Sequence, residues 1–223
     1  MLTIVPTPIG NLKDVTLRAL EVLKEVSGVI CEDSRRASLL LNHYQIQKPL
    51  VVLNDFNETK VYPQIIEKLK NGENLALISD AGTPLISDPG FKLVRECLHQ
   101  NIPVDSLPGA SSILPALTLS GLPPDKFIFL GYPPDKPGHR QNLYRQIKEM
   151  SETLNATLIL FIAPFKLIKT LEELKESLGD VEITLAKELT KIHQKVEGKL
   201  ISSWLDEFKK QNPKGEWVLL FRL

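Results

Sequence analysis

The chain has 223 residues, enough for one large or two small domains, and its 43% hydrophobic and 24% charged residues are ordinary for a globular protein. Its 27 basic and 27 acidic residues cancel, so no overall positive charge attracts nucleic acid. No apolar run approaches the roughly 20 residues of a membrane span, and the N-terminus lacks the features of a signal peptide, so we expect a cytoplasmic protein with no membrane partner.

The first half of the chain alternates β-branched apolar runs with segments of helical periodicity. Strands are predicted at LTIV, GVICE, LVVLN, NLALIS and PVDSL, and helices at about residues 16–26, near Ile65, after Pro89 and up to Leu119. Asp88 is the predicted N-cap of the third helix, and Phe91, Val94 and Leu98 are its predicted buried face. This alternation is typical of βαβ units on a mostly parallel sheet.

A break at Gly121, Pro123 and Pro124 predicts a boundary between a domain of residues 1–121 and a domain of residues 122–223. Beyond it, strands are predicted at FIFLG, TLILFI, VEITLAKEL, HQKVEGKL and EWVLLF, with helices after the loop YPPDKPGHR, at about residues 167–178 and around Trp204. We therefore predict two α/β domains, the N-terminal one with a mostly parallel sheet and the C-terminal one with a mixed sheet.

Three loops of small residues follow strands of the first domain: PTPIGN, SDAGTP and PGASS. Open α/β sheets bind ligands at the carboxyl ends of their strands, and small residues let the backbone approach a ligand closely, although such residues also dominate ordinary turns. The chain has no phosphate-binding loop, dinucleotide fingerprint, zinc-protease motif or nucleophile elbow. Its two cysteines lack metal-binding spacing, so we predict a small-molecule site without a metal.

Longer motifs add a family resemblance that covers nearly the whole chain. They are VPTPIGNLKDVTLRALEVL, CEDSR, LNDFNE, ISDAGTPLISDPG, LPGASSILPAL, SGLP, FLGYPPDKPGHR and KELTK. In this order they resemble the tetrapyrrole-methylase-like S-adenosylmethionine-dependent methyltransferases, and within them the ribosomal RNA cytidine 2′-O-methyltransferases. The resemblance implies S-adenosylmethionine in a cleft between two domains, methylation of a cytidine ribose in small-subunit ribosomal RNA rather than DNA, and a homodimer.

The same resemblance implies which residues bind the cofactor. In the first domain they are Pro8, Ile9, Gly10, Asp80, Ala81, Gly82, Thr83, Pro84, Ala110, Ser111 and Ser112. In the second domain Ile162, Ala163 and Leu189 are expected to flank the adenosine, although apolar residues at strand ends are also common in cores.

Substrate and catalytic residues are expected among the charged and amide side chains of CEDSR, LNDFNE, KELTK and the proline-containing loop. The expected substrate contacts are Asp33, Arg35, Asn54, Asn57, Lys136 and Arg140. A ribose hydroxyl needs a base to remove its proton, and the candidates for that role are Glu32, Glu58, Glu188 and Lys191. A solvated or self-paired surface cluster is the alternative interpretation of these charges.

Two departures from the family pattern keep other functions open. Where family members commonly carry a Tyr-Glu-Ser-Pro-His-Arg-like stretch, this chain has FIAPFK at residues 161–166, and His139 stands beside Arg140 where two arginines are usual. The alternatives are a methyltransferase of the same fold that acts on a small molecule such as a tetrapyrrole, and a relative that binds S-adenosylmethionine without catalysis.

Overall fold

The computed structural model describes residues 1–223 and divides the chain into two compact units, Met1–Ser111 and Ser112–Leu223. The division lies earlier than the predicted boundary at Gly121. The reason is that the helix after Ser112, α5 (Ile113–Leu119), contacts the last strand of the second unit, β10 (Trp217–Phe221). No helix combines the length and apolarity that crossing a bilayer requires.

The first unit is built on a sheet of five parallel strands in the order β3-β2-β4-β1-β5. The strands are β1 (Leu2–Ile4), β2 (Gly28–Cys31), β3 (Leu50–Val52), β4 (Leu75–Leu77) and β5 (Val104–Ser106). The strand β1 pairs with β4 on one side and β5 on the other, so the three loops of small residues follow three adjacent strands. This confirms the parallel sheet predicted from the alternating pattern.

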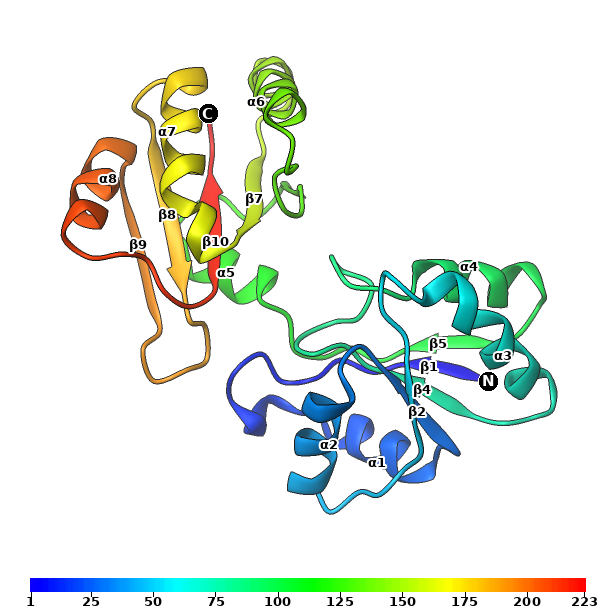
Figure 1. Ribbon diagram of the computed structural model, residues 1–223. Helices are drawn as coiled ribbons and strands as arrows, with labels where there is room; N and C mark the ends of the chain where they lie inside the picture. The colour runs from blue at the N-terminus through cyan, green and yellow to red at the C-terminus, as the bar shows by residue number, and fades with distance from the viewer. The chain divides into compact units, whose positions relative to one another are not determined.

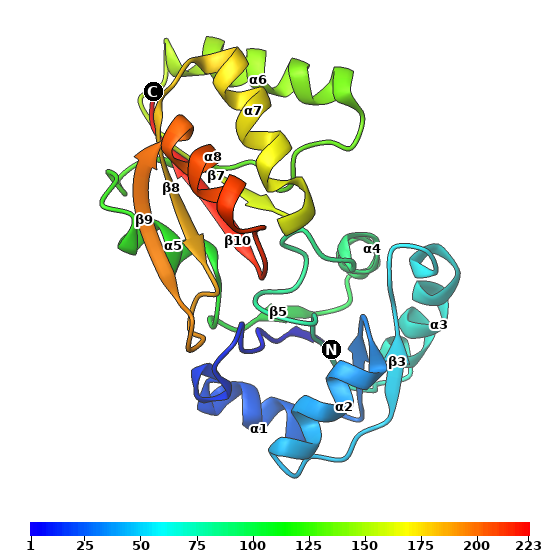
Figure 2. The ribbon, with the colours of Figure 1, turned by 60° about the vertical axis from the view of Figure 1, so that its left-hand side comes forward.

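Helices cover both faces of this sheet, as Figures 1 and 2 show. They are α1 (Leu17–Glu25), α2 (Ser34–His43), α3 (Glu58–Lys70) and α4 (Phe91–His99). The core against α1 and α2 includes Leu23 and Leu41, and the core against α3 and α4 includes Ile65, Leu93 and Cys97. The result is three layers with a separate core on each side of the sheet.

Two features of this unit correct the sequence analysis. The helix α2 was not predicted, although Asp33 caps it and Ala37 and Leu41 give it a buried stripe. In α4, Phe91 and Leu98 are 62% and 61% exposed, whereas Leu93 and Cys97 are buried, so the predicted face was wrong. The N-cap of α4 is Gly90 rather than Asp88.

The second unit has a mixed sheet in the order β6-β7-β10-β8-β9, which confirms the mixed sheet predicted for it. Its further strands are β6 (Phe127–Phe129), β7 (Thr157–Ile162), β8 (Glu182–Lys187) and β9 (Lys195–Leu200). One core joins the sheet to α6 (Pro137–Ser151), α7 (Leu167–Leu178) and α8 (Ile201–Lys210), with Tyr144 and Trp204 among its largest buried side chains. Only β6 and β7 run parallel.

Candidate functional site

The loops of small residues after β1, β4 and β5 are bonded to one another. Thr7 and Gly82 exchange two backbone hydrogen bonds. The distance from N of Thr7 to O of Gly82 is 2.9 Å, and that from N of Gly82 to O of Thr7 is 2.8 Å. The Thr83 hydroxyl donates a hydrogen bond to the carbonyl of Ala110 at 3.0 Å. Segments that are far apart in the sequence therefore form one surface at the carboxyl edge of the sheet.

Two glycines make this close approach possible. A Cβ on Gly109 would lie 2.7 Å from the Cβ of Pro6, closer than such atoms come in proteins. Gly82 has a φ of 83°, and a Cβ there would lie 3.3 Å from Cγ2 of Ile9. Larger residues at these two positions would separate the loops.

The predicted cofactor residues of the first unit gather on these three loops. Pro8, Gly82 and Pro84 are buried, while most of the others are half-buried and so border solvent. Those half-buried residues are Ile9, Asp80, Ala81, Thr83, Ala110 and Ser111; Ser112, also half-buried, begins the second unit, and Gly10 is exposed. In the second unit Ile162 ends β7 with its side chain in the core, Ala163 follows it, and Leu189 is buried.

A group of carboxylates lies at the same edge, after β2 and β4. Burial, together with the charges of Asp80 and Asp55, raises the pKa of Asp88 to about 6, although a hydrogen bond to Ser79 lowers it. Burial also raises the pKa of Glu32, as do the charges of Asp80 and Asp88. Carboxyl groups whose pKa values move toward neutrality are suited to accept a proton during a reaction.

Arg36 is the cation nearest to this group. Its Nε lies 3.3 Å from Oδ2 of Asp80. The pKa of Asp80 is nevertheless raised, because burial outweighs the attraction of Arg36. Neither Asp88 nor Arg36 is among the residues predicted for the site. The pattern SDPG is typical of a helix start, and no pattern in the sequence links Arg36 to Asp80, which lies on another loop.

Glu58, a predicted catalytic residue, has a structural role. It is buried, and its Oε1 accepts hydrogen bonds from the backbone N–H groups of Lys92 at 2.9 Å and Leu93 at 3.3 Å. These groups begin α4, whose N-cap Gly90 has no side chain to satisfy them. Glu58 therefore caps α4 and is not placed to accept a substrate proton.

Glu188 and Lys191 also form structural contacts. Oε1 of Glu188 accepts hydrogen bonds from the backbone N–H of Glu216 at 2.8 Å and from Nζ of Lys191 at 3.1 Å. Nζ of Lys191 lies 2.8 Å from Oε2 of Glu216. A side chain on Gly215 would occupy the position of the Glu188 carboxylate. Glu188 and Lys191 thus connect the segment after β8 to the start of β10. Among the predicted proton acceptors, only Glu32 has a carboxylate that accepts no hydrogen bond from the protein.

The predicted substrate residues of the first unit mostly bond to each other. Asp33 accepts hydrogen bonds from the backbone and guanidinium of Arg35, and these bonds lower the pKa of Asp33 to about 2. Oδ1 of Asn57 accepts a hydrogen bond from the N–H of Asn54 at 2.8 Å, and Nδ2 of Asn57 donates to the carbonyl of Val52 at 3.1 Å. These residues shape the turns before α2 and α3, and the Arg35 side chain remains 87% exposed.

The two predicted substrate residues of the second unit differ sharply. Lys136 is the exposed N-cap residue of α6. The side chain of Arg140 is only 9% exposed and forms an ion pair with Glu173. The prediction that Arg140 itself contacts RNA is therefore not supported, because its guanidinium is already bonded inside the unit.

Comparison with known proteins places the chain among the S-adenosylmethionine-dependent methyltransferases. A family model described as Tetrapyrrole (Corrin/Porphyrin) Methylases matches residues 1–202, and the chain belongs to this family. The half-buried residues on the three loops, with no room for a Cβ at Gly109, are compatible with a cofactor at this edge of the sheet.

Several relatives are more than 40% identical to this chain over the aligned residues. A protein of Thermotoga maritima named Ribosomal RNA small subunit methyltransferase I is 43% identical over 215 residues, covering 96% of this chain and 95% of its own. A protein of Haemophilus influenzae with the same name is 45% identical, covering 99% of this chain and 77% of its own.

Two solved structures share the fold. Diphthine synthase superposes with a TM-score of 0.75 at 18% identity, covering 99% of this chain and 89% of its own. Uroporphyrin-III-C-methyltransferase from Thermus thermophilus gives 0.65 at 19% identity, covering 98% and 93%. These likenesses confirm the predicted fold class.

Proposed function

We propose that this protein methylates the ribose 2′-hydroxyl of a cytidine in small-subunit ribosomal RNA. The observation that carries the proposal is the near full-length identity above 40% to relatives named for the methylation of that RNA. The cytidine and the 2′-hydroxyl come from the motif resemblance and are the finer part of the proposal.

S-adenosylmethionine supplies an electrophilic methyl group on a sulfonium when it is bound. The role proposed for this chain is to hold the methyl donor with the loops around Gly82 and Ala110 and to remove the hydroxyl proton. Glu32 is the proposed proton acceptor, because it is half-buried at the end of β2 and its pKa is raised by burial and by neighbouring carboxylates. Ile162, Ala163 and Leu189 stay predicted contacts to the adenosine.

The test is methyl transfer from labelled S-adenosylmethionine to purified small ribosomal subunits, with tetrapyrrole precursors as the competing substrate. A 2′-O-methyl group removes the hydroxyl that attacks the neighbouring phosphodiester, so the modified linkage should resist alkaline hydrolysis. An oligonucleotide with deoxycytidine at the target should accept no label. Label on the tetrapyrrole alone would overturn the RNA substrate, and no transfer to either would favour a non-catalytic binding protein.

The same assay tests Glu32 as the proton acceptor. Glu32→Gln should lower kcat by about a hundredfold or more, the usual range for loss of a general base, and leave cofactor affinity unchanged. Arg35→Ala, on an exposed side chain nearby, is a control for disturbance of the β2 edge. A Glu32→Gln variant with wild-type kcat would move the role to Asp88.

A homodimer is part of the proposal, since twofold pairing is the commonest assembly of soluble proteins. Light scattering should give twice the chain mass of 25.0 kDa at micromolar concentrations. A mass of one chain throughout that range would reject it.

A further inference from the structure

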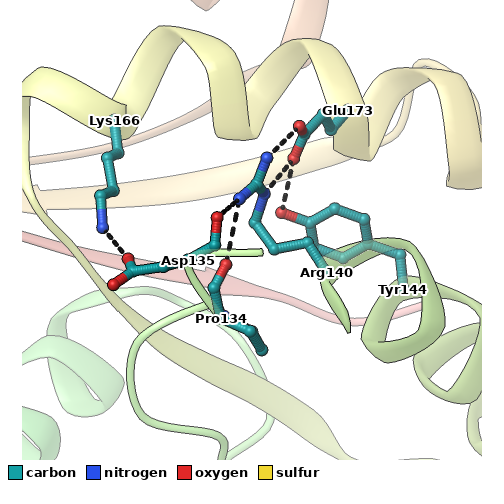
Figure 3. A network of polar contacts seen from close by, with 6 residues as sticks. All are labelled: Pro134, Asp135, Arg140, Tyr144, Lys166 and Glu173. Carbon is teal, nitrogen blue, oxygen red and sulfur yellow. Dashed lines mark hydrogen bonds and ion pairs between the residues drawn. The ribbon is translucent and has the colours of Figure 1, made fainter. Parts of the chain in front are cut away.

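The guanidinium of Arg140 connects the loop before α6 to α7 (Figure 3). Nε and Nη2 of Arg140 donate hydrogen bonds to the two carboxylate oxygens of Glu173, at 2.8 Å and 2.7 Å. Nη1 of Arg140 donates to the backbone carbonyls of Pro134 at 3.1 Å and Asp135 at 2.5 Å. One side chain of α6 thus joins the loop backbone to α7.

The burial and charge of this contact make it specific. Arg140 and Glu173 have side chains 9% and 21% exposed, and Tyr144 adds a hydrogen bond to Glu173 at 3.4 Å. A paired carboxylate and two carbonyls match the planar fork of an arginine, which a lysine cannot reproduce. The same loop has a second, outer contact, in which Asp135 pairs with Lys166.

The conformation of the loop determines the position of Lys136. This exposed residue directly follows Asp135 and is the N-cap of α6. A loop that is ordered before binding avoids the entropy cost of being ordered by its ligand. The contacts of Arg140 therefore fix the backbone immediately before the exposed side chain of Lys136.

We propose that Arg140 and Glu173 are positioning residues for RNA binding, which hold the Pro134–Lys136 loop so that Lys136 meets a phosphate of the substrate. The inference rests on the proposed RNA substrate. It gives Arg140 a role through Lys136 instead of a direct contact with RNA.

The first test is Glu173→Gln, assayed with small ribosomal subunits and labelled S-adenosylmethionine. We expect KM for the subunits to rise several-fold, while kcat at saturating RNA and cofactor affinity stay at wild-type values. Glu172→Gln, an exposed neighbour on the same helix, is the matched control and should change none of these. A loss confined to folding would instead lower the active fraction and leave KM unchanged, and that result would overturn the inference.

A double-mutant cycle tests the route through Lys136. Lys136→Ala alone should raise KM and reduce its salt dependence by about one phosphate contact. In the Lys136→Ala background, Glu173→Gln should raise KM no further, because the side chain it positions is gone. Independent, multiplied effects of the two substitutions would overturn the inference.

A third variant, Asp135→Asn, separates a positioning effect from a purely electrostatic effect, because the two predict opposite changes in KM. It can be measured even if Glu173→Gln fails to fold. Asp135 is 83% exposed, so Asp135→Asn should fold normally while losing the Lys166 contact. Removing a negative charge beside a phosphate would by itself lower KM, whereas a loosened loop raises it. A lowered or unchanged KM overturns the inference. Failure of the proposed function is seen as no methylation of small subunits by the wild-type protein. Failure of the inference alone leaves wild-type methylation intact and is seen only in the variants.

Discussion

Charged side chains that look equivalent in the sequence have different environments in the structure. Glu58 and Arg140 were expected to meet substrate, yet both are buried and bonded to a distant segment: Glu58 accepts hydrogen bonds from the backbone of α4, and Arg140 pairs with Glu173 of α7. The partners Lys92 and Glu173 lie 34 and 33 positions away along the chain. No local pattern reveals such partners. The loops of small residues were predictable, since their conformational requirements are local.

Substitution Glu58→Ala should destabilise the protein without impairing the reaction. It leaves the half-buried N–H of Lys92 and the buried N–H of Leu93 at the start of α4 without an acceptor, so the free energy of unfolding should fall by about 1–3 kcal/mol. Urea denaturation measures this loss, and Glu21→Ala on the exposed face of α1 is the control. Wild-type stability together with a reduced kcat would return Glu58 to the list of catalytic residues.

The raised pKa of Asp88 predicts a pH-dependent stability. A carboxyl that binds its proton more tightly in the folded chain, with a pKa of about 6 against 3.8, disfavours folding as pH rises through this interval. Asp88→Asn removes that cost, so the variant should be more stable at pH 8, by on the order of 1 kcal/mol once solvent screening is allowed for.

The gain in the Asp88→Asn variant should shrink as the pH falls through this interval and vanish only below about pH 3, where the wild-type carboxyl is protonated in both the folded and the unfolded state. Denaturation midpoints at a series of pH values measure it. The exposed Asp14→Asn serves as the comparison. A stability difference that does not change with pH would show that Asp88 has an ordinary titration.

At the scale of elements, the existence and order of the strands followed from their β-branched runs, but the orientation of α4 did not. Phe91 and Leu98 are spaced along the helix as regularly as Leu93 and Cys97, and Val94 fits either stripe. The stripe that faces the sheet depends on how α4 packs beside α3, which involves residues of another element. The cap of α4 is equally unpredictable from the α4 sequence, because the capping residue, Glu58, belongs to α3.

The close contact between the loops after β1 and β5 predicts that a single added methyl group, at Gly109, will weaken cofactor binding. In Gly109→Ala, the new Cβ would meet Pro6 at 2.7 Å, so the two loops must separate. We expect affinity for S-adenosylmethionine to fall by about tenfold, equivalent to about 1.4 kcal/mol. Calorimetry measures it, and Gly138→Ala, whose Cβ would meet nothing within 4 Å, is the control. Equal affinity in both variants would mean that this junction does not shape the cofactor site.

At the scale of the whole molecule, the chain forms two units whose cores do not share residues. The clusters around Leu23 and Ile65 belong to Met1–Ser111, and the cluster around Trp204 belongs to Ser112–Leu223. The sequence break at Gly121 marks the end of α5 rather than the division itself. The helix has no feature in its own sequence that assigns it to the second unit.

The position of α5 predicts how fragments behave. A fragment of residues 112–223 should unfold cooperatively at a higher temperature than a fragment of residues 122–223, which lacks the helix that contacts β10. Circular dichroism during heating compares them. Equal midpoints would show that α5 contributes nothing to this unit and would favour the boundary at Gly121.

The central place of β1 has a consequence for synthesis on the ribosome. Leu2 pairs with Leu75 on one side and with Val104 on the other, so β1 is synthesised well before either of the two strands that pair with it. Pairings so distant along the chain slow folding. Until β4 emerges, the apolar segment around Ile4 has no strand to pair with, and one edge of β1 stays open until β5 follows. Exposed apolar strands are prone to aggregate, so nascent chains of this protein should depend on chaperones until β5 has been made.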